Sequence, residues 1–105
     1  MSQFDVYRNP SAAARAVIPY VVNIQSDLLD SLPTRLTIPL GASSAHANLG
    51  PQTLCPLVKF GDEELGVLAH LAVAFRTRDL GKQVGSLDSQ SALLVRALDA
   101  VLSGV

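Results

Sequence analysis

The feature that most constrains the fold of this sequence is the contrast between its C-terminal segment and the residues before it. The last stretch, SLDSQSALLVRALDAVLSGV, contains no proline and carries apolar residues at helical spacing. We therefore predict one terminal helix with Ser86 or Asp88 as its N-cap and with Arg96 and Asp99 on its more exposed flanks. Its predicted buried stripe comprises Leu94, Leu98, Val101 and Leu102.

Most of the earlier apolar runs are short and show the period of two that is typical of β-strands. Residues 4–7 alternate in this way, as in a half-buried strand, and so do residues 17–24 and residues 36–40. Pro19 and Pro39 cannot donate a hydrogen bond to a neighbouring strand. Pro19 therefore predicts an edge or a bulge at the start of its strand, and Pro39 predicts an edge.

Residues 55–75 are harder to interpret, because their apolar positions fit both a helix and strands. Gly61-Asp62 is a hairpin signal after residues 57–60, and Gly66 weakens a helix, so we interpret the segment as strands. Residues 41–51 are predicted to form a loop and residues 76–85 a polar connector. The fold class is then mainly β with a C-terminal helix, a small antiparallel barrel or curled sheet with the helix packed on it.

Length and charge restrict the functions that such a chain can have. The 105 residues, 11.1 kDa, predict a single domain over residues 1–105. The net charge of -1 provides no broad positive field, so direct binding of nucleic acid is not favoured. The hydrophobic fraction of 49% favours a homo-oligomer in which a second copy covers part of the apolar surface.

The N-terminus and the single cysteine indicate where the protein works. Cys55 is the only cysteine, lies beside Leu54 and Pro56, and is expected to be a buried thiol in a reducing compartment. We expect no signal peptide, and no run of about 18 apolar residues is present to span a membrane. The expected location is the cytoplasm.

Residues that carry chemistry are sparse. His46 and His70 are too far from each other and from Cys55 in the sequence to predict a metal site. The acidic residues at 62–64 are interpreted as a solvated hairpin tip, and no phosphate-binding loop or nucleophile motif is present. We therefore expect a binding protein and not an enzyme, with no catalytic residue, metal or cofactor.

Several segments resemble one protein family in their order along the chain. QFDVY, IQSDLLD, IPL, LCPLVKFGDE and the terminal LSGV follow the pattern of CcdB, the toxin of plasmid-maintaining toxin–antitoxin modules. The resemblance implies an SH3-like barrel, shared with MazF-type toxins, that forms a homodimer, and it implies a strand over residues 64–74. It also implies that the dimer binds the A subunit of DNA gyrase, traps the enzyme with cleaved DNA, and is neutralised by a CcdA-like antitoxin.

The resemblance implies gyrase-binding residues in two places. The first is the pair Leu28 and Leu29, which lies between two aspartates, although a hairpin that folds back with half-buried leucines is the alternative interpretation. The second is the C-terminus, where the family has Trp-Gly-Ile and this chain has Ser, Gly and Val. The full set of candidate gyrase-binding residues is Leu28, Leu29, Asp99, Ser103, Gly104 and Val105.

Two alternative functions remain open at this stage. A MazF-like ribonuclease would need basic residues in one groove, and these would come from Arg15, Arg35, Arg76 and Arg78. A CcdB-like protein with lost or altered gyrase toxicity is the other alternative, because Ser103 replaces the tryptophan that stacks on a gyrase arginine in the family.

Overall fold

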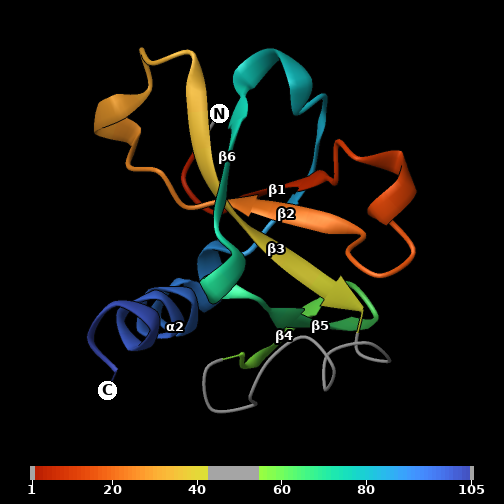
Figure 1. Cartoon of the computed structure of the whole chain (residues 1–105), viewed down its shortest axis with the longest axis vertical. Coiled ribbons are helices and arrows are strands. Elements are labelled where there is room, and N and C mark those ends of the chain that lie inside the picture. Colours follow the sequence, from red (N-terminus) through yellow and green to blue (C-terminus); the bar gives the residue numbers. More distant parts are fainter. Residues whose placement is uncertain (1, 43–54, 105) are drawn as a thin grey trace.

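The computed structural model describes residues 2–42 and 55–104, which form one curled antiparallel sheet with a helix against it (Figure 1). The sheet has seven strands in the order β4-β5-β3-β2-β1-β7, and β6 pairs with β3 beside this path. The predicted small barrel-like β fold with a C-terminal helix is therefore confirmed. The elements are β1 (Asp5–Arg8), β2 (Tyr20–Asn23), β3 (Thr34–Ala42), β4 (Leu57–Phe60), β5 (Glu63–Val67), β6 (Val73–Arg76), β7 (Gln83–Ser86) and α2 (Ser91–Ser103).

β3 is the central strand of the sheet, which makes the edge predicted from Pro39 wrong. One side of β3 pairs with β2, and the other side pairs first with β6, over residues 34–37, and then with β5, over residues 40–42. Pro39 lies between these two partners, and its carbonyl accepts a hydrogen bond from Leu68 N at 3.0 Å. Pro39 has no N–H to donate, and it lies at the point where the strand next to β3 changes from β6 to β5.

The segment predicted as one strand over residues 64–74 is two strands. β5 ends at Val67, a 3-10 turn, η3 (Ala69–Leu71), follows, and β6 begins at Val73. The turn is required because β5 and β6 pair with different parts of β3, and η3 also contacts α2. Strand was the correct choice over helix on both sides of the turn.

The connector predicted at residues 76–85 contains a strand. After the 3-10 turn η4 (Thr77–Asp79), β7 pairs antiparallel with β1. Most residues of β7 are exposed, so its sequence shows no alternation of apolar and polar residues that would predict a strand. Because β1 then has a neighbour on each side and cover on both faces, Asp5 and Tyr7 are buried, and β1 is not the half-buried strand that its pattern indicates.

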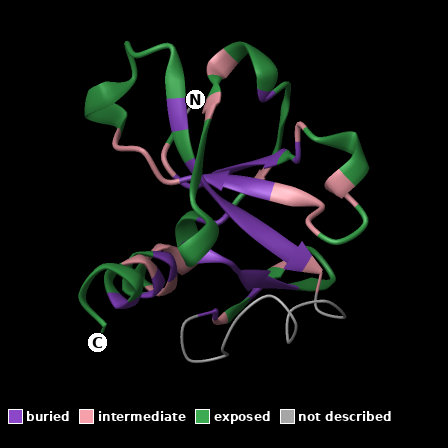
Figure 2. Cartoon of the chain, viewed as in Figure 1, coloured by how far each residue is buried: buried purple, intermediate pink, exposed green. Residues whose placement is uncertain are grey.

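Buried residues lie mainly along the strands and on one face of the helix (Figure 2). Their side chains form two groups. The larger group contains Val6 of β1, Val22 of β2 and Ile38 of β3, together with Leu94 of the helix. The smaller group contains Tyr7, Val21 and Leu80, with Phe75 against them.

The helix buries a different face from the predicted stripe. α2 begins at Ser91 after a 3-10 turn, η5 (Asp88–Gln90), and its N-cap is Gln90, so neither Ser86 nor Asp88 caps the helix as predicted. Ser86 Oγ instead accepts a hydrogen bond from Asp88 N at the start of η5. Leu98 is half-buried, while Val101 and Leu102 are exposed. Arg96 and Asp99 are exposed, as predicted. The buried residues are Leu94, Ala97 and Ala100.

Candidate partner-binding surface

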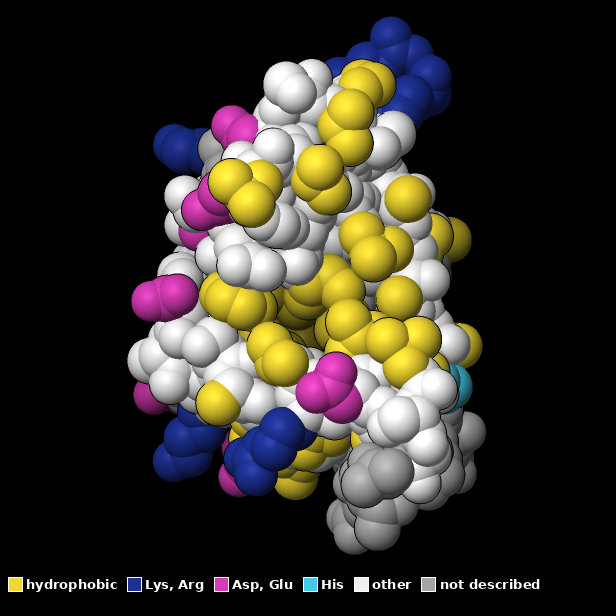
Figure 3. All heavy atoms as spheres, turned by 90° about the vertical axis from the view of Figure 1, so that its left-hand side faces the viewer, with side chains coloured by type: hydrophobic (Ala, Val, Ile, Leu, Met, Phe, Trp, Pro, Cys, Tyr) yellow, Lys and Arg dark blue, Asp and Glu magenta, His cyan; other side chains and the backbone are white. Residues whose placement is uncertain are grey.

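One side of the molecule carries both the loop between β2 and β3 and the helix α2 (Figure 1). Figure 3 views this side and shows hydrophobic side chains gathered around a hollow. Leu28 in the loop is 93% exposed and Leu102 in the helix is 76% exposed, the highest values among the large hydrophobic residues that the structure describes. Burial of exposed apolar surface is the main driving force for association, so this side is the candidate binding surface.

An apolar cavity of about 150 Å³ lies between the loop side and the helix. Phe4, at its wall, has a φ angle of +72°, a conformation that a bulky side chain rarely adopts. Its N–H donates to Asn23 O at 2.6 Å and its carbonyl accepts from Leu87 N at 2.8 Å, so pairing on both sides holds this backbone in place. The cavity is lined by Gln3, Phe4, Ile24, Leu94, Val95 and Leu98.

Leu28 and Leu29 lie on a single 3-10 turn, η2 (Asp27–Leu29), at the tip of the loop. Ser26 caps the turn, because its Oγ accepts a hydrogen bond from Leu28 N at 3.2 Å. Leu28 is 93% exposed and Leu29 is 47% exposed, so neither leucine is half-buried as the alternative interpretation expected. Leu28 therefore points into solvent and is available to a partner.

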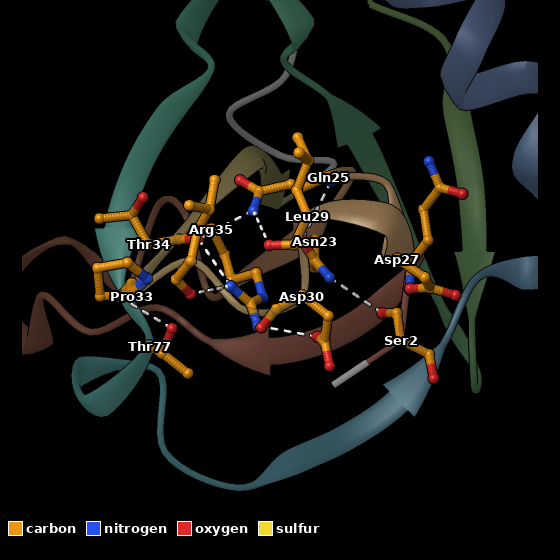
Figure 4. A network of polar contacts seen from close by, with 12 residues as sticks. Ser2, Asn23, Gln25, Asp27, Leu29, Asp30, Pro33, Thr34, Arg35 and Thr77 are labelled. Atoms are coloured by element: carbon orange, nitrogen blue, oxygen red, sulfur yellow. Dashed lines mark hydrogen bonds and ion pairs between the residues drawn. The ribbon is translucent and has the colours of Figure 1, made fainter.

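The two aspartates beside these leucines anchor the loop. Asp27 Oδ1 accepts a hydrogen bond from Gln3 N at 2.8 Å, which ties the turn to the N-terminal segment. Asp30 Oδ1 forms an ion pair with Arg35 Nη2 at 2.8 Å, which ties the turn to β3 (Figure 4). The carboxylates therefore have partners inside the molecule, while the apolar side chain of Leu28 faces outward.

Further hydrogen bonds brace the same loop on both sides. The Gln25 amide donates to Leu29 O and to Thr34 O, and its Oε1 accepts from Leu36 N. On the other side, Pro33 O accepts from both the N–H and the hydroxyl of Thr77. Among the described residues, no buried side-chain nitrogen or oxygen lacks a hydrogen-bond partner.

The structure brings together two of the candidate residues at the end of the helix. Asp99 and Ser103 line a shallow depression of about 590 Å³ with Arg96 and Leu102. The Ser103 hydroxyl donates to Asp99 O at 2.7 Å, and the residue is exposed. Gly104 follows with a φ angle of +74° and donates its N–H to Ala100 O, which ends the helix.

The loop and the helix end are separate parts of one side (Figure 1). The apolar cavity separates them, with Ile24 just before the loop and Leu98 one turn before Leu102. Leu28 and Leu29 are therefore not in one pocket with Asp99 and Ser103, and a partner that contacts both would cover the cavity as well. The remaining candidate, Val105, lies outside the described residues.

Cys55 and His70 meet in the fold although the sequence spacing gave no sign of it. Cys55 Sγ lies 3.6 Å from His70 Nδ1, and burial raises the pKa of the thiol above its ordinary value. The predicted burial of Cys55 is confirmed. Within residues 2–42 and 55–104 no three metal-ligating side chains form a cluster, and His46 lies outside this part of the chain.

Three of the four arginines considered for a ribonuclease groove are bound within the molecule. Arg35 is only 5% exposed, Arg15 Nε donates to Asn9 O at 2.7 Å, and Arg76 pairs with Asp79 at 3.2 Å. Arg76 and Arg78 line one open depression together with Pro33 and Thr77. The burial of Arg35 contradicts its assignment to a groove that would grip a phosphate backbone.

The fold defines a small barrel-like β protein with a terminal helix. Its exposed apolar side is a candidate surface for a partner. Residues 3–104 match the family model described as CcdB protein, and the chain belongs to the CcdB family. Membership of this family supports a role as the toxin of a toxin–antitoxin system, with protein partners. A comparison with curated proteins finds no match. No helix in the described part of the chain is long and apolar enough to cross a membrane.

Proposed function

We propose that this CcdB-family protein acts in the cytoplasm as a homodimer that binds the A subunit of DNA gyrase and traps the enzyme with cleaved DNA. The observation that carries the proposal is the exposed Leu28 on a fixed loop, on the same side as the exposed end of α2. The toxin acts by binding and performs no covalent chemistry, so it is not an enzyme and requires no metal or cofactor. It inhibits a topoisomerase in this way without touching nucleic acid directly.

A homodimer is supported by the amount of apolar surface that one copy leaves exposed. Leu36, Leu71, Val73 and Val95 are all more than a third exposed, in addition to the leucines of the loop. A stable interface of standard size buries about 800 Å² on each partner. A second copy of this chain could cover part of this surface while the loop tip stays accessible to gyrase.

The CcdA-like antitoxin completes the proposed system. The resemblance to this family implies an antitoxin whose disordered tail folds on the toxin. Such a tail would suit a surface with an apolar cavity and exposed aliphatic side chains. Loss of this antitoxin would release the toxin, and a module of this kind would contribute to plasmid maintenance.

One observation favours a second candidate function, a CcdB-like protein with lost or altered gyrase toxicity. Ser103 is exposed, and its hydroxyl is used by the helix backbone, so it offers no stacking surface to a gyrase arginine. This protein would keep the fold and antitoxin binding but bind gyrase weakly. The ribonuclease alternative loses support, because Arg35 is buried.

Expression in a gyrase-proficient cell, with and without a candidate CcdA-like antitoxin, tests these functions. We expect growth arrest that the antitoxin relieves and that a toxin-resistant gyrase A mutant also relieves. Arrest with loss of intact messenger RNA would instead indicate a ribonuclease. No arrest, with the purified protein folded and able to bind the antitoxin, would indicate the second candidate function.

A further inference from the structure

The position of Leu28 is set by other parts of the chain and not by its own packing. The side chain is 93% exposed, and η2 is only three residues long. A single 3-10 turn has few hydrogen bonds of its own and poorer geometry than an α-helix, so it does not hold its shape alone. The conformation of the loop must therefore come from contacts made by neighbouring residues.

Arg35 makes the largest set of these contacts. Its Nη1 donates to Leu32 O at 2.6 Å and to Thr34 O at 2.8 Å. Its Nη2 donates to Asp30 O at 2.7 Å and to Asp30 Oδ1 at 2.8 Å. The guanidinium thus binds three backbone carbonyls and one carboxylate on the arm of the loop that returns to β3 (Figure 4).

The geometry of the guanidinium suits this role. Its planar fork presents several N–H donors in fixed directions, which a lysine ammonium cannot reproduce. The other arm of the loop has its own anchor, since Asp27 accepts from Gln3 N. The turn that carries Leu28 is thus held at both ends, and Arg35 holds the end nearer β3.

Arg35 cannot contact a partner itself, because its side chain is only 6% exposed. Any effect of Arg35 on partner binding is therefore indirect. We propose that Arg35 is a positioning residue, which holds the loop in the one conformation that presents Leu28 and Leu29 to a partner. This inference rests on the proposed function for its binding partner, but the effect of Arg35 on the loop can be measured without any partner.

The expected effect on affinity follows from the fraction of molecules whose loop is correctly placed. The apparent dissociation constant equals the intrinsic constant divided by this fraction. In Arg35→Met, which keeps an apolar stem but has no donors, a competent fraction of about one tenth would weaken binding about tenfold. In Arg35→Lys, which keeps the charge but loses the fork, we expect a smaller loss.

A double-mutant cycle tests whether Arg35 acts through the leucines. We would measure binding of a purified gyrase A fragment, by calorimetry, to the wild type, Arg35→Met, the double variant Leu28→Ala/Leu29→Ala, and all three substitutions combined. We expect Arg35→Met to weaken binding about tenfold in the wild type and less than about threefold when the leucines are absent. Equal losses in both backgrounds, or no loss in either, would overturn the inference.

Amide hydrogen exchange provides the readout that needs no partner. In Arg35→Met the amides of Leu28, Leu29 and Leu32 should exchange about tenfold faster or more, because their hydrogen bonds lie within the loop, while those of core strand residues stay unchanged. Unchanged loop amides would refute the inference even if gyrase binding is strong. A wild type that does not bind gyrase, with loop amides that respond as expected, would refute the proposed function and leave the role of Arg35 in place.

Melting curves of all variants separate positioning from a general loss of stability. If Arg35→Met does not fold, Arg35→Lys takes its place in both measurements, with the same directions and smaller effects. Faster exchange of core amides together with loop amides in that variant would show that Arg35 supports the whole fold and does not specifically position the loop.

Discussion

The side chain of Gln90 pairs with the backbone of Lys59 as a neighbouring strand would. Its Oε1 accepts from Lys59 N at 3.0 Å and its Nε2 donates to Lys59 O at 2.7 Å. Lys59 lies in β4, an edge strand of the sheet, so the Gln90 side chain occupies backbone hydrogen-bonding groups that would otherwise face solvent. An unpaired edge is a template for association with other chains, and here one glutamine blocks part of it.

Replacing Gln90 by Ala should therefore lower stability and expose the edge of β4. Two backbone hydrogen bonds are lost, which corresponds to a cost of about 1–3 kcal/mol. Chemical denaturation would measure this loss, and light scattering would detect the increased association. Ser89→Ala, at an exposed position of the same turn, is the matched control and should change neither. Equal stability of the two variants would show that the Gln90 pairing contributes nothing.

Gly85 should not tolerate a larger residue. A Cβ atom at this position would clash with Phe60 Cε1 in β4, so the Phe60 ring would have to shift. This ring packs edge-to-face on Tyr20, with 5.1 Å between the ring centroids. We expect Gly85→Ala to destabilise the protein by about 1–3 kcal/mol, the usual cost of overpacking. The same substitution in a Phe60→Leu background should cost less, because the clash is relieved. Thermal melting of the four proteins measures both effects, and an equal cost in both backgrounds would contradict the contact.

Cys55 should react slowly with thiol reagents in the native protein. The side chain is buried, and burial raises the pKa of the thiol from its ordinary value of 9.0, so little of the reactive thiolate forms near neutral pH. Labelling should be fast only after denaturation with urea. Rapid native labelling at pH 7 would show that the site opens readily.

The same pKa shift predicts how stability changes with pH. Folding favours the neutral thiol, so this contribution is fully present below the ordinary pKa of 9.0 and is lost as the pH rises through the raised pKa. Tyr7, whose pKa is raised mainly by burial, adds a similar loss above its ordinary value of 10.0. Urea unfolding between about pH 8 and pH 10 should show a decline that is shallower in Cys55→Ala. An identical decline in the two proteins would exclude the thiol as its source.

The proposed homodimer makes a prediction about mass. Sedimentation at micromolar concentration should give about twice the 11.1 kDa of one chain. If a second copy covers the exposed Leu36, Leu36→Asp should weaken the dimer, because a carboxylate is costly to bury in an interface. Lys82→Asp, at another exposed position, serves as the control. A wild type that sediments only as a monomer would refute the dimer.

The sequence predicts elements whose burial alternates and misses those whose burial does not. β1, β2 and β3 were located because apolar residues recur every second position, whereas β7 is mostly exposed and carries no such pattern. The face of α2 was misplaced because Leu102 is large and apolar but exposed, while the smaller Ala97 and Ala100 are buried. The pairing of β7 and the buried face of α2 depend on the topology of the chain, which a pattern of residue types does not reveal.

The anchors of the candidate site were also beyond the reach of the sequence. Asp27 was noticed for its position beside Leu28, but its partner is 24 residues away at Gln3. The sequence indicates Arg35 only as a surface charge, because nothing in the residues around it shows that a loop will bury its side chain. The family resemblance identifies the leucines at the tip, and the structure shows that contacts of Asp27 and Arg35 hold the loop that carries them.

The last prediction concerns Ser103, where the family has tryptophan. Ser103 is exposed, and the cap at Gly104 does not depend on its side chain, so Ser103→Trp should change stability by less than about 0.5 kcal/mol. A buried tryptophan side chain covers about 200 Å², which at about 25 cal/mol per Å² corresponds to at most about 5 kcal/mol of binding free energy. Even a third of this would raise affinity for a gyrase A fragment more than about tenfold.

Ser103→Ala is the matched control for this substitution. It removes the hydrogen bond to Asp99 O without adding an aromatic ring, so its affinity should stay close to that of the wild type. Calorimetry with the gyrase A fragment and thermal melting of the three proteins separate binding from folding, and toxicity in cells should follow affinity. If Ser103→Trp melts like the wild type and binds gyrase no more tightly, the end of α2 is not the contact surface in this protein, and gyrase binding must then rest on the loop that carries Leu28.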